Sequence, residues 1–238
     1  SVIAELTTRM WNGHEIQKYK VTDGGSEIGD LLRVTDALSV INKPALIPWA
    51  VRMATEYLSG FEGQPITQDL LEEAKKQHTK AKKEAANLGT QVHKWAEEYI
   101  KTGERKLPND ERVVNGILAF LKWVEEHTVE FISSERMVYS RMHQYIGTMD
   151  AEAEVNGERC VVDFKTSKAV YPEMRYQVAA YQHAAEEEGS VYTGNRWIVR
   201  FDKEPGDFEA PQYNEYEQDF LAFVSALNLK RREKALKQ

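Results

Sequence analysis

The dipeptide Asn156-Gly157 constrains the fold of this chain more than any other feature, because it stands between two strand-like runs. Asn-Gly between alternating apolar runs is the strongest short-range signal for a β-hairpin. Residues 144–155 and 159–165 are therefore expected to pair as neighbouring antiparallel strands. A chain with this hairpin near its centre has to build a sheet, and the helical patterns on either side have to pack against it.

Apolar spacing, helix-start residues and turn residues predict the other elements along the chain. Helical patterns cover residues 44–58, 67–87, 91–101, 108–127, 172–188 and 215–237. Strand patterns cover residues 129–139 and 196–201. We expect Pro44 and Pro48 to break or delay the first helix, and Leu88-Gly89-Thr90 to separate the second helix from the third. The resulting order of elements predicts an α/β chain in which helices flank a small sheet.

Composition excludes several classes of protein. The 238 residues carry 31 basic and 38 acidic side chains, and the net charge of −7 argues against binding nucleic acid through bulk charge alone. The single cysteine, Cys160, excludes an internal disulfide and a cysteine-ligated iron–sulfur cluster. No apolar run reaches the length of a membrane span, and the start of the chain lacks a secretory pattern, so a cytoplasmic location is expected.

Two acids and a lysine fall on the paired strands. Asp150 lies on the first strand, whereas Asp163 and Lys165 share one face of the second because strand side chains alternate. Two carboxylates and an ammonium are costly to bury together, and Mg²⁺ favours one or two carboxylates plus waters. By itself an Asp-x-Lys triplet is a weak signal, since a solvent-facing charged edge is the more frequent explanation.

Four further residues strengthen the functional interpretation, although each also has a plainer explanation. Glu135 lies on the more apolar face of residues 129–139, where a register bulge or a surface salt bridge explains it equally well. His93 opens an amphipathic segment, but a lone histidine is more often packed than a ligand. Gln177 and Tyr181 share one face of an alanine-rich helix, where a packed tyrosine beside an exposed glutamine is the commoner arrangement.

These motifs form a composite in chain order, namely Gly89-x-x-x-His93, Glu135, Gly147-x-x-Asp150, Asp163-x-Lys165 and Gln177-x-x-x-Tyr181. Over about residues 88–200 the composite resembles the RecB-like branch of the PD-(D/E)xK nuclease superfamily, and it is similar to phage-type recombination exonucleases. Met149 departs from the family pattern, which often has proline before the first aspartate. The resemblance implies a restriction-endonuclease-like core, a small mixed sheet flanked by helices, with a helical N-terminal region.

The resemblance also implies a set of metal ligands. Asp150 and Asp163 match the acids that bind Mg²⁺ or Mn²⁺ in such nucleases, and the main-chain carbonyl of Phe164 joins them. His93 matches an additional ligand of the RecB-like branch. Glu135 matches an acid often found near a second metal position.

Catalytic roles follow from the same resemblance. Lys165 would orient or help to deprotonate the attacking water. Gln177 and Tyr181 match a helix motif that supports the catalytic site and touches the substrate strand. The implied reaction is hydrolysis of DNA phosphodiester bonds to leave 5′-phosphates, carried out by an exonuclease of phage or bacterial recombination and repair.

DNA is the implied partner, and a homo-oligomer or a recombination partner protein would also fit the resemblance. Because the net charge is negative, local basic patches would have to bind the DNA, and the favoured patch comprises Lys75, Lys76, Lys80, Lys82 and Lys83. A basic run at the C-terminus is better explained as a solvated helix face. Two alternatives stay open: a structure-selective endonuclease, and a catalytically inactive DNA-binding protein on the same fold.

The domain organisation is expected to be simple. Residues 1–30 are polar and are expected to form a flexible segment before a single nuclease domain over 31–238. Within that domain we expect a helical wall over 31–87 that folds over the metal site as an arch, a catalytic core over 88–200, and a C-terminal loop and helix over 201–238.

Overall fold

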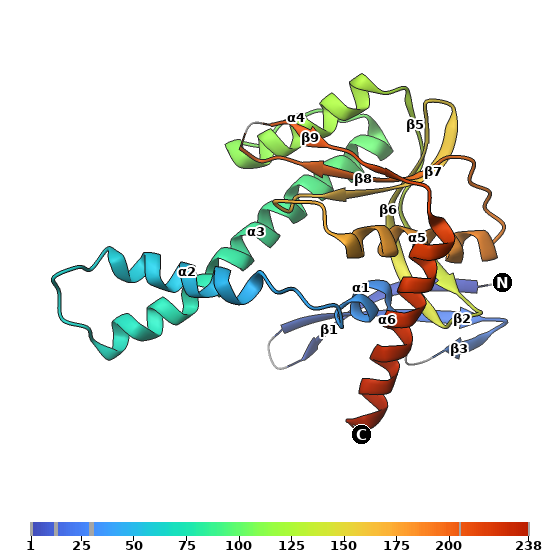
Figure 1. Ribbon diagram of the computed structural model, residues 1–238. Helices are drawn as coiled ribbons and strands as arrows, with labels where there is room; N and C mark the ends of the chain where they lie inside the picture. The colour runs from blue at the N-terminus through green and yellow to red at the C-terminus, as the bar shows by residue number, and fades with distance from the viewer. Residues whose placement is uncertain (1, 12–13, 29–30, 205, 238) are drawn as a thin grey trace.

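The computed structural model describes residues 2–11, 14–28, 31–204 and 206–237, and helices cover both faces of its central sheet (Figure 1). The helices are α1 (Val34–Leu38), α2 (Leu46–Ser59), α3 (Gln68–Thr102), α4 (Glu111–Glu126), α5 (Pro172–Glu187) and α6 (Tyr216–Leu236). The strands are β1 (Val2–Trp11), β2 (His14–Asp23), β3 (Ser26–Ile28), β4 (Leu32–Arg33), β5 (Val129–Ser140), β6 (Tyr145–Val155), β7 (Glu158–Lys165), β8 (Arg196–Phe201), β9 (Phe208–Glu209) and β10 (Gln212–Tyr213). None of the described helices is both long enough and apolar enough to cross a membrane.

The central sheet is built around the predicted hairpin. Its strand order is β10-β8-β7-β6-β4, β5 also pairs with β6, and β9 pairs with β8. Asn156 and Gly157 join β6 to β7 with φ angles of 52° and 84°, the left-handed conformation that a two-residue hairpin turn requires. β7 pairs with β8 in parallel, and α5 makes the crossover between them. The expected α/β class, with a small mixed sheet flanked by helices, is confirmed.

The sheet separates two apolar cores because its side chains alternate between faces. On β7, Val161 packs into the cluster beneath α1, α5 and α6, while Val162 and Phe164 pack into the cluster beneath α3 and α4. All three side chains are at most 2% exposed. Each contributes roughly 1.5–3 kcal/mol of transfer free energy on burial, so the strand that carries Asp163 is held firmly on both faces.

Helix α3 runs without interruption through Leu88-Gly89-Thr90, so the predicted break between two helices is wrong. Thr67 caps its start as expected, accepting a hydrogen bond from the Leu70 amide at 3.2 Å. A glycine inside a helix costs only about 1 kcal/mol relative to alanine, which a packed helix tolerates. Gly89 is needed for close packing, because a Cβ there would lie 2.6 Å from Oγ1 of Thr166.

Residues 2–11 and 14–28 contain regular strands, in the part of the chain for which the polar sequence predicts a flexible segment. β1 pairs with β2 and β2 pairs with β3, both antiparallel. Contacts with distant parts of the chain attach this sheet to the core. Val21 is fully buried against Tyr139 and Ile146, and Arg141 forms a two-pronged ion pair with Asp23 at 2.6 and 2.7 Å. Because these partners are more than a hundred residues away, the local sequence does not show the attachment.

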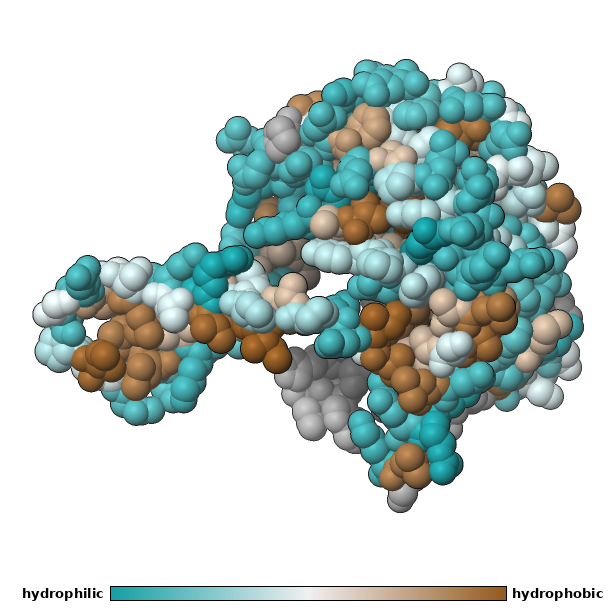
Figure 2. Space-filling view, viewed as in Figure 1, coloured by the Kyte–Doolittle hydropathy of each residue, from teal (hydrophilic) through white to brown (hydrophobic). Residues whose placement is uncertain are grey.

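The α2 helix and the first half of α3 form a hairpin that projects from the body as an arm (Figure 1). The arm contains helices of residues 31–87, the segment for which a wall over the metal site is expected. The segment at 39–45 spans from α1 to the arm, and Figure 2 shows an opening between this segment and the body. Apolar side chains are exposed along the arm, as Figure 2 also shows; they include Leu46, Ile47, Val51, Ile66 and Leu71.

A buried charge network stabilises β6 outside the predicted site. The Glu152 carboxylate is 1% exposed and accepts hydrogen bonds from Ser133 (2.8 Å), Arg136 (2.8 Å), Arg159 (3.1 Å) and Tyr192 (2.6 Å). Desolvation opposes its ionisation, but the hydrogen bonds outweigh this cost and lower the pKa of Glu152 to about 2. The ionised form therefore stabilises the fold at all pH values above the ordinary pKa near 4.5.

Replacing Glu152 by glutamine is expected to lower the free energy of unfolding at pH 7 by roughly 2–4 kcal/mol, because two arginines lose their buried counter-charge. Urea denaturation measures the change, and Glu154→Gln, at an exposed position of the same strand, is the matched control. The difference between wild type and Glu152→Gln should shrink as the pH falls from 5 towards 2. A difference that stays constant over that range would contradict the network's role.

Candidate active site

The two aspartates of the predicted site lie side by side on β6 and β7. Ala151 pairs with Val162 at the last ladder position, so Asp150 and Asp163 occupy the next one. There the Asp150 carboxylate enters between the strands, and its Oδ2 accepts the Phe164 amide hydrogen at an N–O distance of 2.7 Å. The local sequence explains this placement, because the tight hairpin fixes the register and the register fixes the neighbours.

Lys165 connects the aspartates to helix α5. Its Nζ lies 2.7 Å from Oδ2 of Asp163 and donates a hydrogen bond to Oε1 of Gln177 at 2.8 Å. Nε2 of Gln177 in turn donates to the Tyr181 hydroxyl at 2.8 Å. Gln177 and Tyr181 are 8% and 3% exposed. Gln177 is therefore buried, which differs from the commoner arrangement of a packed tyrosine beside an exposed glutamine. The ring of Tyr181 can pack on β6 because Gly147 has no side chain to collide with it.

His93 approaches the aspartates from α3. Its Nδ1 lies 3.6 Å from Oδ2 of Asp150, and its side chain is 30% exposed. The close packing of Gly89 on Thr166 brings α3 to this distance from the end of β7. Helix α3 and the β6–β7 hairpin therefore place His93, Asp150, Asp163 and Lys165 at one position.

The two aspartates have different proton affinities. Desolvation and the neighbouring Asp150 carboxylate raise the pKa of Asp163 to about 7. Desolvation acts in the same direction on Asp150, but His93, Lys165 and the Phe164 amide outweigh it and lower the pKa of Asp150. The positive groups of the site are therefore insufficient to balance two ionised carboxylates.

Oδ2 of Asp163 is buried, and the Lys165 ammonium lies 2.7 Å from it. Two buried carboxylates on neighbouring strands that share one ammonium fit a hard divalent cation. Among the described residues, no three His, Cys, Asp or Glu side chains already form a metal cage. Asp150 and Asp163 with waters match the preference of Mg²⁺, which retains several waters and does not need an all-protein cage.

Glu135 lies at the edge of the site with an unusual backbone. Its neighbours Ser134 and Arg136 pair with Ala151 and Met149, so Glu135 faces Asp150 across β5 and β6. Its φ angle is +53°, and a register shift upstream interrupts the alternation of β5. The expectation that Glu135 points inward with the core is wrong, since its side chain is exposed. Partial desolvation and the carboxylates of Asp150 and Glu97 raise the pKa of Glu135 to about 7.

The predicted lysine patch lies on the arm half of α3, and much of its charge is locally balanced. Lys75 is paired with Glu72 at 2.8 Å, and Glu73 is paired with Lys76 at 3.2 Å and Lys80 at 2.8 Å. Lys82 and Lys83 have no ion pair among the described residues. The structure therefore does not gather the five lysines at the aspartates.

Sequence reasoning missed two residues that adjoin the site. Thr166 packs on Gly89, and Arg200 is the register partner of Lys165 on the parallel strand β8. Thr166 follows Lys165 directly, so its proximity could have been inferred from the strand. The position of Arg200 depends on the register between the parallel strands β7 and β8, which α5 connects. The sequence does not show this register.

No family model matches the chain, and no curated protein matches it. Among solved structures, it is similar to an alkaline exonuclease (LHK-Exo) from Laribacter hongkongensis, with 12% sequence identity, a TM-score of 0.40, and coverage of 87% of this chain and 94% of that chain. LHK-Exo in complex with dAMP gives 11% identity, a TM-score of 0.38 and the same coverage.

Asp163→Asn is expected to remove the stabilisation that Mn²⁺ gives the folded protein. A metal that binds only the native state raises the melting temperature, and the rise grows with the logarithm of the metal concentration divided by Kd. The substitution removes a charged ligand and so raises Kd. Thermal melting in EDTA and in Mn²⁺ measures the response for wild type and variant. Without metal, the variant should be at least as stable as wild type, because the amide relieves the repulsion from Asp150. Equal Mn²⁺-induced shifts in both proteins would contradict this ligand assignment.

Proposed function

We propose that this protein is a metal-dependent DNA exonuclease that hydrolyses phosphodiester bonds and leaves 5′-phosphates. The observation that carries the proposal is the buried cluster of Asp150, Asp163 and Lys165, in which two carboxylates share one ammonium. Such an arrangement is poorly suited to a purely structural role, because buried charges are normally paired and hydrogen-bonded. It suits a site that binds a cation and a phosphodiester.

Asp150 and Asp163 would hold Mg²⁺ or Mn²⁺, together with the main-chain carbonyl of Phe164 and with His93. When bound, such an ion lowers the pKa of a water and polarises the scissile phosphate. The exposed carboxylate of Glu135 faces Asp150 and is available to a second ion or to a water. The proposed ligands are oxygens and one imidazole, which suit Mg²⁺ and Mn²⁺.

Lys165 would place a positive charge beside the reacting phosphate and orient the attacking water. Its ammonium is held by Asp163 at 2.7 Å and by Gln177 at 2.8 Å. Charge directed at the non-bridging oxygens stabilises the transition state more than the ground state. Gln177 and Tyr181 act as positioning residues, since Gln177 fixes Lys165 and Tyr181 fixes Gln177.

The DNA strand would reach the site through the opening beside the segment at 39–45 (Figure 2). A strand that has to pass through an opening enters by its end more readily than by the middle of a duplex, which favours an exonuclease. Lys82 and Lys83 are the members of the predicted patch that remain available to phosphates, because Lys75, Lys76 and Lys80 are paired. A role in phage or bacterial recombination or repair, in the cytoplasm, completes the proposal.

Asp163→Asn and Lys165→Ala should each reduce cleavage of linear DNA in Mg²⁺ by roughly 10³-fold or more, because both act mainly in the transition state. Gel assays of end-labelled DNA give the rates, and circular dichroism verifies that the variants fold. Lys234→Ala, at an exposed position of α6, is the control and should cleave like wild type. Near wild-type cleavage by either folded site variant would remove the catalytic assignment.

Linear DNA should be degraded in Mg²⁺ while covalently closed circular DNA survives under identical conditions, because entry requires an end. Agarose gels of the two substrates, sampled over time, make the comparison. EDTA should stop the degradation. Rapid nicking or linearisation of the closed circles would instead favour the structure-selective endonuclease.

A further inference from the structure

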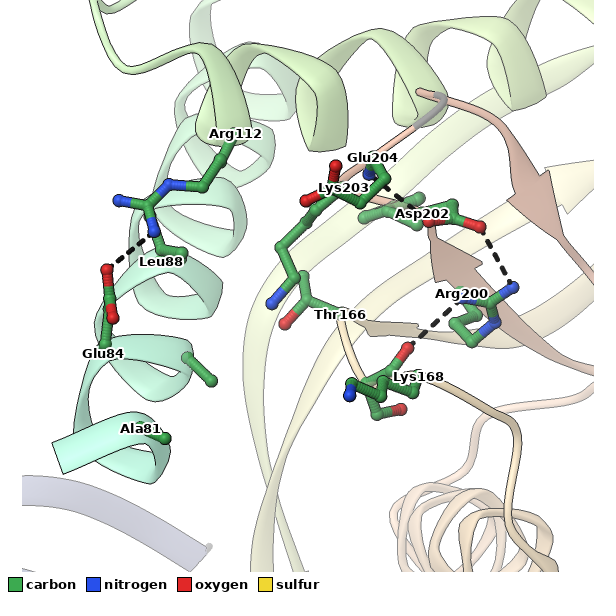
Figure 3. Close-up of a pocket in the computed structure, with 13 residues that line it drawn as sticks. Ala81, Glu84, Leu88, Arg112, Thr166, Lys168, Arg200, Asp202, Lys203 and Glu204 are labelled. Atoms are coloured by element: carbon green, nitrogen blue, oxygen red, sulfur yellow. Dashed lines mark hydrogen bonds and ion pairs between the residues drawn. The ribbon is translucent and has the colours of Figure 1, made fainter. Parts of the chain in front are cut away.

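A large cavity adjoins the candidate active site on the side of α4 and β8. Its volume is about 590 Å³, within the range of pockets that hold small organic ligands. Figure 3 shows its walls: α3 contributes Ala81, Glu84 and Leu88, the start of α4 contributes Arg112, and the opposite side is formed by residues 166–168 and 200–204. The cavity is distinct from the carboxylate cluster, none of whose residues lines it.

The cavity begins one residue beyond the candidate catalytic lysine. Thr166, which lines it, follows Lys165 in the chain, and Arg200, which also lines it, is the register partner of Lys165. Leu88 lies on the helix that carries His93, five residues earlier. A strand whose phosphodiester sits at the aspartates therefore has its neighbouring nucleotide within reach of this space.

Four cations and three acids line the cavity, and their pairing leaves two ammonium groups without a counter-charge. Arg112 is paired with Glu84 at 2.6 Å, and Arg200 lies 3.8 Å from Asp202 and 3.1 Å from Glu209 outside the cavity. The remaining acid is Glu204, whose side chain is exposed.

Lys203 and Lys168 have no ion pair or side-chain hydrogen bond in the described part of the chain. Figure 3 shows the Lys203 side chain extending into the space between Thr166 and α3. Desolvation lowers the pKa of Lys203, and the neighbouring Arg112 and Lys168 charges act in the same direction. An anion bound there would supply the missing counter-charge.

The α3 side of the wall is apolar. Ala81, Ala85 and Leu88 line the cavity there, whereas the ring of Phe201 is fully buried in the core cluster beneath α3 and α4. An inorganic anion would leave the apolar wall without contacts. An apolar ligand would leave two unpaired ammonium groups without a counter-charge. A nucleotide has both parts, a phosphate and a flat base that packs on aliphatic and aromatic side chains.

We propose that this cavity binds the nucleotide adjacent to the scissile phosphodiester of the substrate strand, with its phosphate at Lys168 and Lys203 and its base against the apolar α3 wall of Ala81, Ala85 and Leu88. The inference rests on the proposed nuclease function for the identity of the strand. It adds a binding subsite that anchors the strand on the far side of Lys165 from the aspartates.

The test compares Lys168→Ala/Lys203→Ala with the control Lys230→Ala/Lys234→Ala. The control removes two lysines on α6 that also have no ion pair among the described residues and match the pocket pair in exposure. Fluorescence anisotropy with a labelled single-stranded oligonucleotide in Ca²⁺ gives Kd at several salt concentrations. Cleavage in Mg²⁺ is measured separately for wild type and for each variant.

The pocket variant should bind about 10-fold more weakly than wild type. The magnitude of its salt dependence, the slope of log K against log salt, should fall by about 0.7 because one phosphate of the single strand loses its contacts. In cleavage its KM should rise while kcat changes little, and Lys168→Arg/Lys203→Arg should restore binding. The control variant should match wild type in every measurement.

The outcomes separate the two proposals. If wild type cleaves DNA but the pocket variant binds with unchanged Kd and salt slope, the subsite is overturned and the nuclease function stands. If wild type fails to cleave but binding still depends on Lys168 and Lys203, the nuclease function fails and the cavity remains a nucleic-acid site. A wild-type protein that neither binds nor cleaves DNA overturns both the nuclease function and the subsite. If the control variant loses binding as much as the pocket variant does, the effect comes from overall charge and the subsite is overturned.

Discussion

The rest of the site depends on the proximity of two carboxylates, Asp150 and Asp163, on adjacent antiparallel strands. Water does not screen Asp163, which is 2% exposed, and repulsion from Asp150 adds to the cost of its burial. Lys165 offsets part of that cost through its ion pair with Asp163, but one ammonium faces two carboxylates. The remaining free-energy cost of burying two neighbouring carboxylates has to be offset by another interaction, and a bound cation is the simplest one.

The layered architecture makes this arrangement rigid. The apolar side chains of β7 anchor it in both cores, so Asp163 and Lys165 have little freedom to separate. Helix α5 adds the Gln177–Tyr181 pair beneath Lys165, and α3 brings His93 towards Asp150. Preorganised groups of this kind stabilise charge that develops during a reaction without the need to reorganise first. The arm and the lysine-lined cavity lie beside this rigid centre, where a long substrate would extend.

The central part of the fold and the site could be predicted because their signals are local. The Asn156-Gly157 turn fixes the register of β6 and β7, and side-chain alternation then places Asp163 and Lys165 on one face. Helix starts were also predictable, since Thr67 and Asp110 cap their helices through their own side chains. His93, Gln177 and Tyr181 were inferred from a resemblance, and the structure brings them to the same position.

What could not be predicted depends on contacts between distant residues. The attachment of β2 through Val21 involves partners on β5 and β6, and Gly89 looks like a helix break until Thr166 is placed against it. The register shift in β5 moved Glu135 out of the expected alternation. The cavity beside Arg200 requires the β7–β8 register and the loop after β8, neither of which leaves a pattern in the sequence.

The central claim is that Asp150 and Asp163 form a divalent-cation site, and the most direct test is anomalous diffraction from crystals soaked in Mn²⁺. Data collected near the manganese absorption edge locate the ion independently of any assay of activity. The account predicts an anomalous peak between the two carboxylates, within coordination distance of the Phe164 carbonyl and the His93 imidazole. Anomalous peaks at other acidic residues, with none between Asp150 and Asp163, would contradict it.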